Sequence, residues 1–313
     1  MKILIIKPSS FGDIVQAAPC AAALKKAYPG CEISWAVFKQ WQELLEIFPD
    51  IDRIILWDRN KGVKGFFSVL KEIKKTDFDL ILDLQGLIRS ALLAKTARAK
   101  VKLGVPGMKE FSNLLLKEVY PENARMNAAL RNLEPLRFLT DIRFLPEINI
   151  RIDADSSLRA ENLLKECGIC GHFIALMPFA RGKGKDWSIE NYLKLADLLK
   201  ERYAGFEIAV LGAQKDYGKF NSGKIKDICG KTGLKELAAV LSKASLAIGA
   251  DTGPMHLACA LNAPSVFIFG DSDIGETAPY TGRFSLIINK ENRKDINKIS
   301  PEEVFSEAEK WIK

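Results

Sequence analysis

The stretch "LAIGADTGPMHLACAL" (residues 246–261) contains the change from strand to helix on which the fold prediction is built. Its first residues form an apolar run, which is typical of a strand covered on both faces. Its last residues have the apolar spacing of a helix. Asp251, Thr252 and Gly253 stand between the two, where small polar residues commonly start a helix. The stretch therefore predicts a βα unit.

The same alternation of apolar runs and helical patterns continues along the whole chain. The predicted strands are residues 2–7, 32–38, 53–57, 80–85 and 101–105 in the first half, and 173–179, 206–212, 246–251, 265–270 and 285–290 in the second. Alternating βα units imply parallel sheets with helices on both faces. We expect an α/β protein with two doubly wound domains and a ligand cleft between them, at the carboxyl ends of the strands.

A joint between the domains is expected within "RFLPEINIRIDADSS" (143–157), where a proline and a polar stretch interrupt the pattern. The predicted domains are residues 1–150 and 151–313 of the 313-residue chain. A final helix is expected at about 300–313, because Ser300, Pro301 and Glu303 form an N-cap, a first-turn proline and a capping-box glutamate.

The composition is that of an ordinary globular protein, with 48% hydrophobic and 27% charged residues. No stretch approaches the ~18 consecutive apolar residues of a membrane span. Near the N-terminus, only four apolar residues precede Lys7, and no small-residue cleavage site follows them. We therefore expect a first buried strand rather than a signal peptide, and a cytoplasmic protein.

Positive charge is concentrated in one segment. The formal net charge is +7, and residues 95–143 contain ten Lys or Arg against five Asp or Glu. This surplus fits either a solvated helical face or a surface for an anionic partner. A nucleic-acid partner is not expected, because the segment has few aromatic side chains and no recognition motif.

The six cysteines include a CxxC pair, Cys167 and Cys170, followed by His172. A zinc site would need a second pair of ligands at similar spacing, and none is present. We expect free thiols near a turn and no bound metal.

The first candidate site lies in "KPSSFGDIVQAAP" (7–19), after the first strand. Neither a dinucleotide fingerprint nor a GxxxxGK[ST] phosphate loop is present. Asp13 at the start of the following helix is explained by capping alone. Alternatively, its carboxylate faces the cleft and accepts a proton from a substrate hydroxyl.

The second candidate is the junction at Asp251, Thr252, Gly253 and His256. Backbone N–H groups at the N-terminus of the helix, together with its dipole, favour an anion, and glycine permits close approach. The Thr252 hydroxyl and the His256 ring can add hydrogen bonds. The alternative is that Asp251 or Thr252 caps the helix and that His256 is a core residue.

Two loops of the second half complete the candidates. "FARGKGKDWSIENY" (179–192) is rich in glycine and lysine, which suits a phosphate, although a solvated loop has the same composition. "LGAQKDYG" (211–218) places Asp216 after a strand, where it could bind ribose hydroxyls or serve as a turn residue.

These motifs, taken together and in order, resemble the ADP-heptose glycosyltransferases, the heptosyltransferases of lipopolysaccharide inner-core synthesis. The resemblance covers both halves. It is carried by "KPSSFGDIVQAAP", "FDLILDLQGLIRSALLA" (78–94), "GKDWSIENY", "LGAQKD" and "ADTGPMHLACALNAPSVFIFGDSD" (250–273). The stretch at 78–94 resembles the Asp-Gln-Gly-Leu segment of the first, Kdo-directed enzyme.

The resemblance implies two Rossmann-like domains in the GT-B glycosyltransferase architecture and an inverting, metal-independent transfer without a cofactor. It makes Asp13 the general base for the acceptor hydroxyl. Lys185 and the helix N-terminus at Thr252 and Gly253 would hold the leaving diphosphate. Asp251 would bind sugar hydroxyls, Asp216 the ribose, and His256 would support the phosphate site.

On the acceptor side, the resemblance implies anionic Kdo sugars on lipid A, with Arg89 as a contact, on the cytoplasmic face of the inner membrane. The chain departs from some relatives at Ala180 and Arg181, where those carry hydroxyl residues, and at Asp216, where some have glutamate. The alternatives are a second heptosyltransferase or related ADP-sugar transferase and a non-catalytic sugar-binding protein. A nicotinamide-dependent oxidoreductase is disfavoured because G-x-G-x-x-G is absent.

Overall fold

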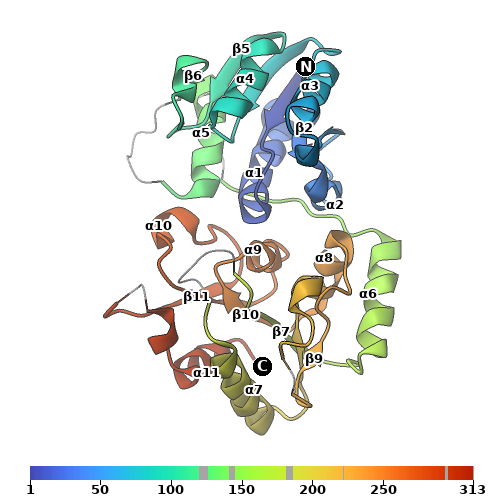
Figure 1. Cartoon of the computed structure of the whole chain (residues 1–313), viewed down its shortest axis with the longest axis vertical. Helices are drawn as coiled ribbons and strands as arrows, with labels where there is room; N and C mark the ends of the chain where they lie inside the picture. The colour runs from blue at the N-terminus through green and yellow to red at the C-terminus, as the bar shows by residue number, and fades with distance from the viewer. Residues whose placement is uncertain (120–125, 141–144, 181–185, 221, 293–294, 313) are drawn as a thin grey trace. The chain divides into compact units, whose positions relative to one another are not determined.

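The computed structural model describes residues 1–119, 126–140, 145–180, 186–220, 222–292 and 295–312. The chain divides into two compact units, Met1–Arg151 (unit 1) and Ile152–Lys313 (unit 2), each built around its own parallel sheet (Figure 1).

The sheet of unit 1 has six strands in the order β3-β2-β1-β4-β5-β6. Its strands are β1 (Lys2–Ile6), β2 (Glu32–Phe38), β3 (Arg53–Trp57), β4 (Phe78–Asp83), β5 (Ala99–Gly104) and β6 (Lys117–Glu118). All neighbours pair in parallel, and Ile6 of β1 is in register with Asp83 of β4. Because β1 is central, its residues 3–6 are fully buried by helices on both faces.

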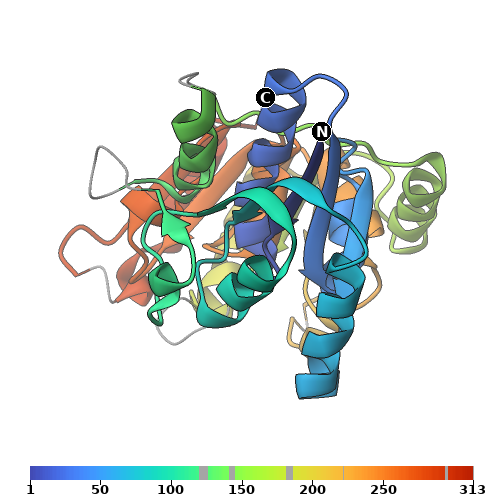
Figure 2. The same cartoon turned by 90° about the horizontal axis from the view of Figure 1, so that it is seen from above.

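The helices of unit 1 fall on two faces of this sheet. They are α1 (Phe11–Ala27), α2 (Gln42–Glu46), α3 (Gly62–Ile73), α4 (Ile88–Thr96) and α5 (Ala128–Thr140), with 3₁₀ turns η1 (Lys39–Trp41), η2 (Arg59–Lys61) and η3 (Ser112–Leu114). The chain steps in one direction from β1 to β3 and in the other from β3 to β5. Right-handed crossovers therefore place α3 and α4 on the face opposite α1, as Figure 2 shows. Helix α5 packs against α1.

Unit 2 repeats this plan, with the strand order β12-β11-β10-β7-β8-β9. Its strands are β7 (Phe173–Met177), β8 (Glu207–Val210), β9 (Lys226–Asp227), β10 (Leu246–Ala250), β11 (Ser265–Phe269) and β12 (Phe284–Ile288). Its helices are α6 (Ala154–Glu166), α7 (Ile189–Arg202), α8 (Leu234–Lys243), α9 (Gly253–Ala260), α10 (Ile274–Thr277) and α11 (Pro301–Glu309), with 3₁₀ turns η4 (Gln214–Asp216) and η5 (Ile296–Lys298).

The predicted fold class is confirmed: both sheets are parallel, and every predicted strand overlaps an observed one. The two-residue edge strands β6 and β9 were not predicted, since such short segments have no periodicity of their own. Each sheet has a switch point, where the direction in which successive strands are added reverses. It lies between β1 and β4 in unit 1 and between β7 and β10 in unit 2. Ligands of doubly wound folds bind at the carboxyl ends of the strands at such points.

Within the described residues, no helix combines the length and the apolar character needed to cross a bilayer.

Candidate functional site

The carboxyl ends of β1 and β4 in unit 1 bring together charged side chains that are far apart in sequence. Lys7 directly follows β1 and is only 5% exposed, and its Nζ donates to the Leu84 carbonyl 2.9 Å away. Asp83 ends β4 and is fully buried. Parallel pairing of β1 with β4 thus places a buried ammonium group beside a buried carboxyl group at the switch point of the sheet.

Asp13 lies in the first turn of α1, where it closes a cap with Ser10. Its Oδ2 accepts hydrogen bonds from the Ser10 backbone N at 2.9 Å and from the Ser10 hydroxyl at 2.6 Å. Burial alone would raise the pKa of Asp13, but the charges of Lys7 and Arg131 and the two Ser10 hydrogen bonds outweigh it and hold the pKa below its usual value. The capping interpretation is therefore correct in geometry, and the same carboxylate stays ionised at neutral pH.

Asp83 organises the loop that leads into α4. Its Oδ1 accepts from the backbone N of Gln85 at 3.0 Å and of Gly86 at 3.1 Å, and its Oδ2 accepts from the Ser90 hydroxyl at 2.9 Å. Burial nevertheless raises the pKa of Asp83 to about 6, since the hydrogen bonds and the nearby Lys7 compensate only in part. Arg89, the predicted acceptor contact, is exposed in the first turn of this helix.

The sequence reasoning missed three charged residues of this site: Lys7, which interacts with Asp13, and Asp83 and Arg131, which both interact with Lys7. Burial lowers the pKa of Lys7, and Asp13 and Asp83 act against this while Arg131 reinforces it. A local signal existed for Lys7 and Asp83, because each places a charge within or directly after an otherwise apolar strand. No such signal marked Arg131, which comes from α5, the helix that packs against α1.

In unit 2, the first turn of α9 follows β10 directly, and Thr252 occupies its N-cap position. The Thr252 hydroxyl makes no capping hydrogen bond, and its Oγ1 is buried without a partner among the described residues. Capping by Thr252 is therefore wrong as an explanation. Because Pro254 has no N–H, the donors of this turn are the amides of Gly253 and Met255, and they have no acceptor within the helix.

Asp251 and His256 form a buried pair at this junction. His256 Nε2 lies 3.0 Å from Asp251 Oδ1, and the two side chains are 7% and 8% exposed. The ring of His256 also contacts Phe267 of β11, with centroids 5.5 Å apart. His256 is thus a core residue and at the same time the partner that orients Asp251. At Gly249 of β10, a Cβ would lie 2.5 Å from the Met177 carbonyl oxygen and 3.0 Å from Met255 Cγ, so this position has no room for a side chain.

Asp216 lies in η4, beyond the carboxyl end of β8, and is 3% exposed. Lys219 Nζ donates to its Oδ1 at 2.6 Å, and the Ala213 N donates to its Oδ2 at 3.3 Å. Both oxygens therefore already have a partner in the protein, and a ribose hydroxyl would have to share them.

Lys185 lies outside the described residues. The two residues that follow it are held by a hydrogen bond and by burial: Asp186 accepts from the Ala180 N at 3.0 Å, and Trp187 is 1% exposed. The indole of Trp187 donates to the Ile299 carbonyl at 2.9 Å and packs edge-on against Tyr192, with centroids 4.8 Å apart. The predicted phosphate loop therefore ends at a fixed anchor.

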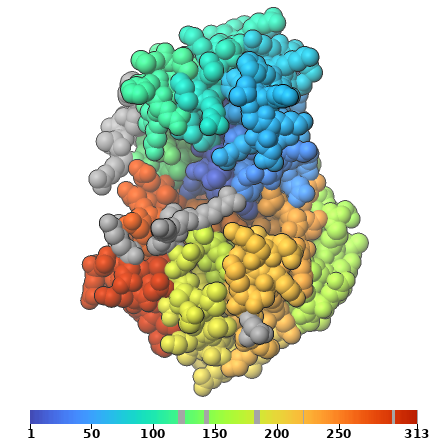
Figure 3. Space-filling view, viewed as in Figure 1, coloured from blue at the N-terminus to red at the C-terminus, as the bar shows by residue number. Residues whose placement is uncertain are grey.

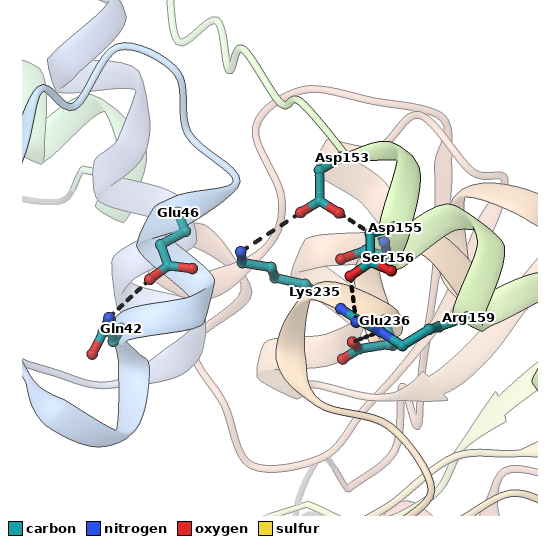
Figure 4. A network of polar contacts seen from close by, with 8 residues as sticks. All are labelled: Gln42, Glu46, Asp153, Asp155, Ser156, Arg159, Lys235 and Glu236. Carbon is teal, nitrogen blue, oxygen red and sulfur yellow. Dashed lines mark hydrogen bonds and ion pairs between the residues drawn. The ribbon is translucent and has the colours of Figure 1, made fainter.

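No group of three or more His, Cys, Asp or Glu suited to a metal ion occurs in the described part of the chain. Asp-x-Asp pairs occur at residues 50–52, 77–79, 153–155 and 271–273. The pair at 153–155 is engaged in unit 2 (Figure 4): Asp153 caps α6 and lies 3.6 Å from Lys235, while Asp155 pairs with Arg159. In the pair at 271–273, Asp273 caps α10.

Cys167 and Cys170 are both free thiols, the first partly buried and the second exposed. Lys231 Nζ lies 3.9 Å from the Cys167 sulfur.

The family model of Glycosyltransferase family 9 (heptosyltransferase) matches residues 66–305. The chain is 30% identical to lipopolysaccharide heptosyltransferase 1 of Campylobacter coli, over 93% of this chain and 88% of the relative. It is 25% identical to the lipopolysaccharide core heptosyltransferase OpsX of Haemophilus influenzae, over 96% and 88%. It is 24% identical to lipopolysaccharide heptosyltransferase 3 of Escherichia coli, over 96% and 95%.

Solved structures show the same fold. The glycosyl transferase family 9 protein of Veillonella parvula superposes with a TM-score of 0.87 at 22% identity, covering 99% of this chain and 96% of that one. The ADP-heptose heptosyltransferase II of E. coli gives 0.83 at 22% identity, covering 99% and 98%. The E. coli heptosyltransferase WaaC bound to ADP-2-deoxy-2-fluoro heptose gives 0.79 at 20% identity, covering 99% of each chain.

Proposed function

The chain belongs to glycosyltransferase family 9, the heptosyltransferases, and we propose that it transfers heptose from ADP-heptose to the Kdo inner core of lipid A. The proposal is carried by the observation that a chain of this family has one candidate site in each unit. Unit 1 holds an ionised carboxylate at the switch point of its sheet, and unit 2 has, at the corresponding point of its own sheet, the N-terminus of α9, where Thr252 makes no capping hydrogen bond.

In the proposed reaction, Asp13 is the general base. The acceptor hydroxyl oxygen attacks the anomeric carbon, the bond from that carbon to the ADP oxygen breaks, and the hydroxyl proton passes to Asp13. The configuration inverts because there is one displacement and no covalent enzyme intermediate. Ser10 holds the carboxylate through two hydrogen bonds, and the charge of Lys7 keeps it ionised until the proton arrives.

The leaving diphosphate is assigned to unit 2. The amides of Gly253 and Met255 and the unpartnered Thr252 hydroxyl are donors at the positive end of α9. Lys185 would add a positive charge, and His256 would fix Asp251 against the sugar hydroxyls. With these groups neutralising the diphosphate, we propose a transfer that needs no divalent metal. Asp216 would receive the ribose.

The acceptor is assigned to unit 1, with Arg89 as a contact for its anionic groups. We propose that the enzyme works on the cytoplasmic face of the inner membrane, where its lipid acceptor would be exposed. The relatives include heptosyltransferases 1, 2 and 3, so a second heptosyltransferase with a different acceptor is the alternative.

Mass spectrometry of the products tests the proposal and its alternative together. The enzyme is incubated with ADP-heptose and either Kdo-lipid A or the same acceptor already carrying one heptose. Addition of one heptose to Kdo-lipid A supports the proposal, and addition only to the heptosylated acceptor supports the alternative. No product with either acceptor, from a protein that binds ADP, would favour a non-catalytic sugar-binding protein.

A further inference from the structure

Helix α3 of unit 1 has an outer face that no described part of the unit covers. Its inner face consists of Gly65, Val69 and Ile73, all buried. A Cβ at Gly65 would lie 2.0 Å from the Asp58 carbonyl oxygen, so the helix packs closely on the segment that leads into η2. The opposite side therefore faces solvent, and Figure 2 shows α3 projecting from the sheet as a light-blue helix.

This outer face is apolar along its centre. Val63 is 71% exposed and Phe67 is 61% exposed, and Leu70, one turn further on, is half-buried. The three residues follow the i, i+4, i+7 spacing of one helical stripe. Isolated exposed apolar residues are ordinary, but a contiguous apolar stripe on the exposed side of a helix indicates an interaction surface.

Lysines border the stripe. Residues 61–75 contain five lysines and a single acidic residue, Glu72. Glu72 is engaged by Arg53 and by Lys75, the latter at 2.5 Å. Lys64, Lys71 and Lys74 form no ion pair with any described carboxylate. A pocket of about 290 Å³ lies on this face, lined by Phe67, Leu70, Lys71, Lys74 and Lys75. Figure 3 shows the surface of this light-blue segment on the face in view.

A second apolar group lies on the same side of the sheet. Helix α4 exposes Ile88 and Leu92 to 38% and 40%, and next to it Phe111 and Leu114 at η3 are 81% and 79% exposed. Because α3 and α4 lie on the same face of the sheet, this side of unit 1 carries both apolar groups. The N-terminus of α3 follows the carboxyl end of β3, at the same edge of the sheet as Asp13.

We propose that this face, defined by Val63, Lys64, Phe67, Leu70, Lys71 and Lys74 of α3, docks on an anionic phospholipid bilayer. Apolar side chains flanked by lysines match an interface of acyl chains beneath phosphate groups. A second copy of the chain fits less well, since facing lysines would repel one another. The inference rests on the proposed function only in that a lipid-anchored acceptor gives the enzyme a reason to bind a membrane.

Co-sedimentation of the full chain with vesicles tests the proposal. The vesicles are phosphatidylcholine alone or phosphatidylcholine mixed with phosphatidylglycerol. We expect binding to the mixed vesicles only, weakened by salt. Each lysine at an anionic surface contributes about a fivefold gain in partitioning, so Lys71→Gln with Lys74→Gln should weaken binding about 25-fold. Phe67→Ser should weaken it through the lost apolar contact.

Matched controls come from unit 2. Lys165 and Lys194 are exposed lysines, and Leu158 is 56% exposed on α6. Lys165→Gln with Lys194→Gln, and Leu158→Ser, should bind vesicles like the wild type. The proposal would be overturned if the control variants lost vesicle binding to the same extent, or if the α3 variants bound vesicles like the wild type. It would also be overturned if the wild type were a dimer that the α3 substitutions dissociate.

A second measurement separates this inference from the proposed activity. Transfer to a water-soluble Kdo acceptor without lipid should be unchanged in the α3 variants, and thermal melts should match the wild type. Loss of transfer to the soluble acceptor in folded α3 variants would show that the face serves catalysis and would contradict a purely membrane-docking role. Absence of transfer in the wild type would count against the proposed function, with vesicle binding still decided separately.

Discussion

His256 Nε2 lies 3.0 Å from Asp251 Oδ1, and both side chains are more than nine-tenths buried. The pair joins the first turn of α9 to the end of β10, so the ring fixes the carboxylate at the edge of the proposed donor site. Without His256, Asp251 would lose its orientation and one hydrogen-bond partner in a buried position.

We therefore expect His256→Ala to weaken ADP-heptose binding or turnover. A hydrogen bond to a charged group contributes about 1.5–3 kcal/mol, which corresponds to a loss of roughly 10- to 150-fold. Calorimetry with ADP and steady-state kinetics measure the two effects. His172→Ala is the matched control, because His172 is exposed and lies far along the chain from this junction. If ADP binding and turnover are unchanged in His256→Ala, the histidine contributes only to packing.

Asp13→Asn should abolish transfer while ADP still binds with near wild-type affinity, because the change removes the proton acceptor and keeps the shape. A general base typically contributes ~10²–10⁴-fold. Asp153→Asn is a suitable control, since Asp153 also caps a helix, through the Ser156 N at 2.7 Å, but in unit 2. If Asp13→Asn retains most of its activity, or only melts at a lower temperature, Asp13 is a helix cap and nothing more.

Lys7→Met should move the acid limb of the kcat/KM profile to higher pH. The ammonium of Lys7 favours the ionised form of Asp13, so its removal raises the pKa of that carboxyl. The profile is measured with a soluble acceptor, alongside Lys25→Met, which removes a lysine of α1 that pairs with Asp52 at 2.6 Å. An acid limb at the wild-type pH in a folded Lys7→Met enzyme would contradict this electrostatic role.

Turnover should survive excess EDTA, because lysine and backbone donors neutralise the leaving diphosphate in the proposed mechanism. The readout is product formation before and after chelation, with ADP binding as a check on the fold. Activity that is lost on chelation and restored by Mg²⁺ or Mn²⁺ would refute metal independence. Asp271 and Asp273, beyond the carboxyl end of β11, would then be the first residues to mutate.

Asp83 should make the protein less stable as the pH rises through about 6. Its pKa is raised from 3.8 to about 6 in the folded chain, so the folded state binds the proton more tightly than the unfolded state. The stabilisation is complete below pH ~4 and is lost above pH ~6, by roughly 3 kcal/mol at 1.36 kcal/mol per pH unit. Urea denaturation across this range should show this dependence in the wild type and a flatter one in Asp83→Asn. Identical curves for the two proteins would exclude Asp83 as the source.

The sequence by itself determined the fold class and the places where function was to be sought. Apolar runs such as residues 2–6 and 246–250 identify buried strands, because covering a strand on both faces requires an unbroken apolar stretch. Small polar residues after these runs indicated Asp13 and Thr252 as helix starts at the carboxyl ends of strands. Such signals are local, and a single chain segment is enough to display them.

Only the tertiary structure decided what surrounds those residues. Lys7 and Leu84 are 77 positions apart, and they meet because β1 pairs with the distant β4 on one side as well as with β2 on the other. Strand order depends on how all the helices pack, so no local pattern encodes it. The same holds for the Thr252 hydroxyl, which sequence rules assign to a cap and which is buried with no partner in the part of the chain that the structure describes. The electrostatics of Asp13 follow from that packing, because Lys7 and Arg131 come from other elements.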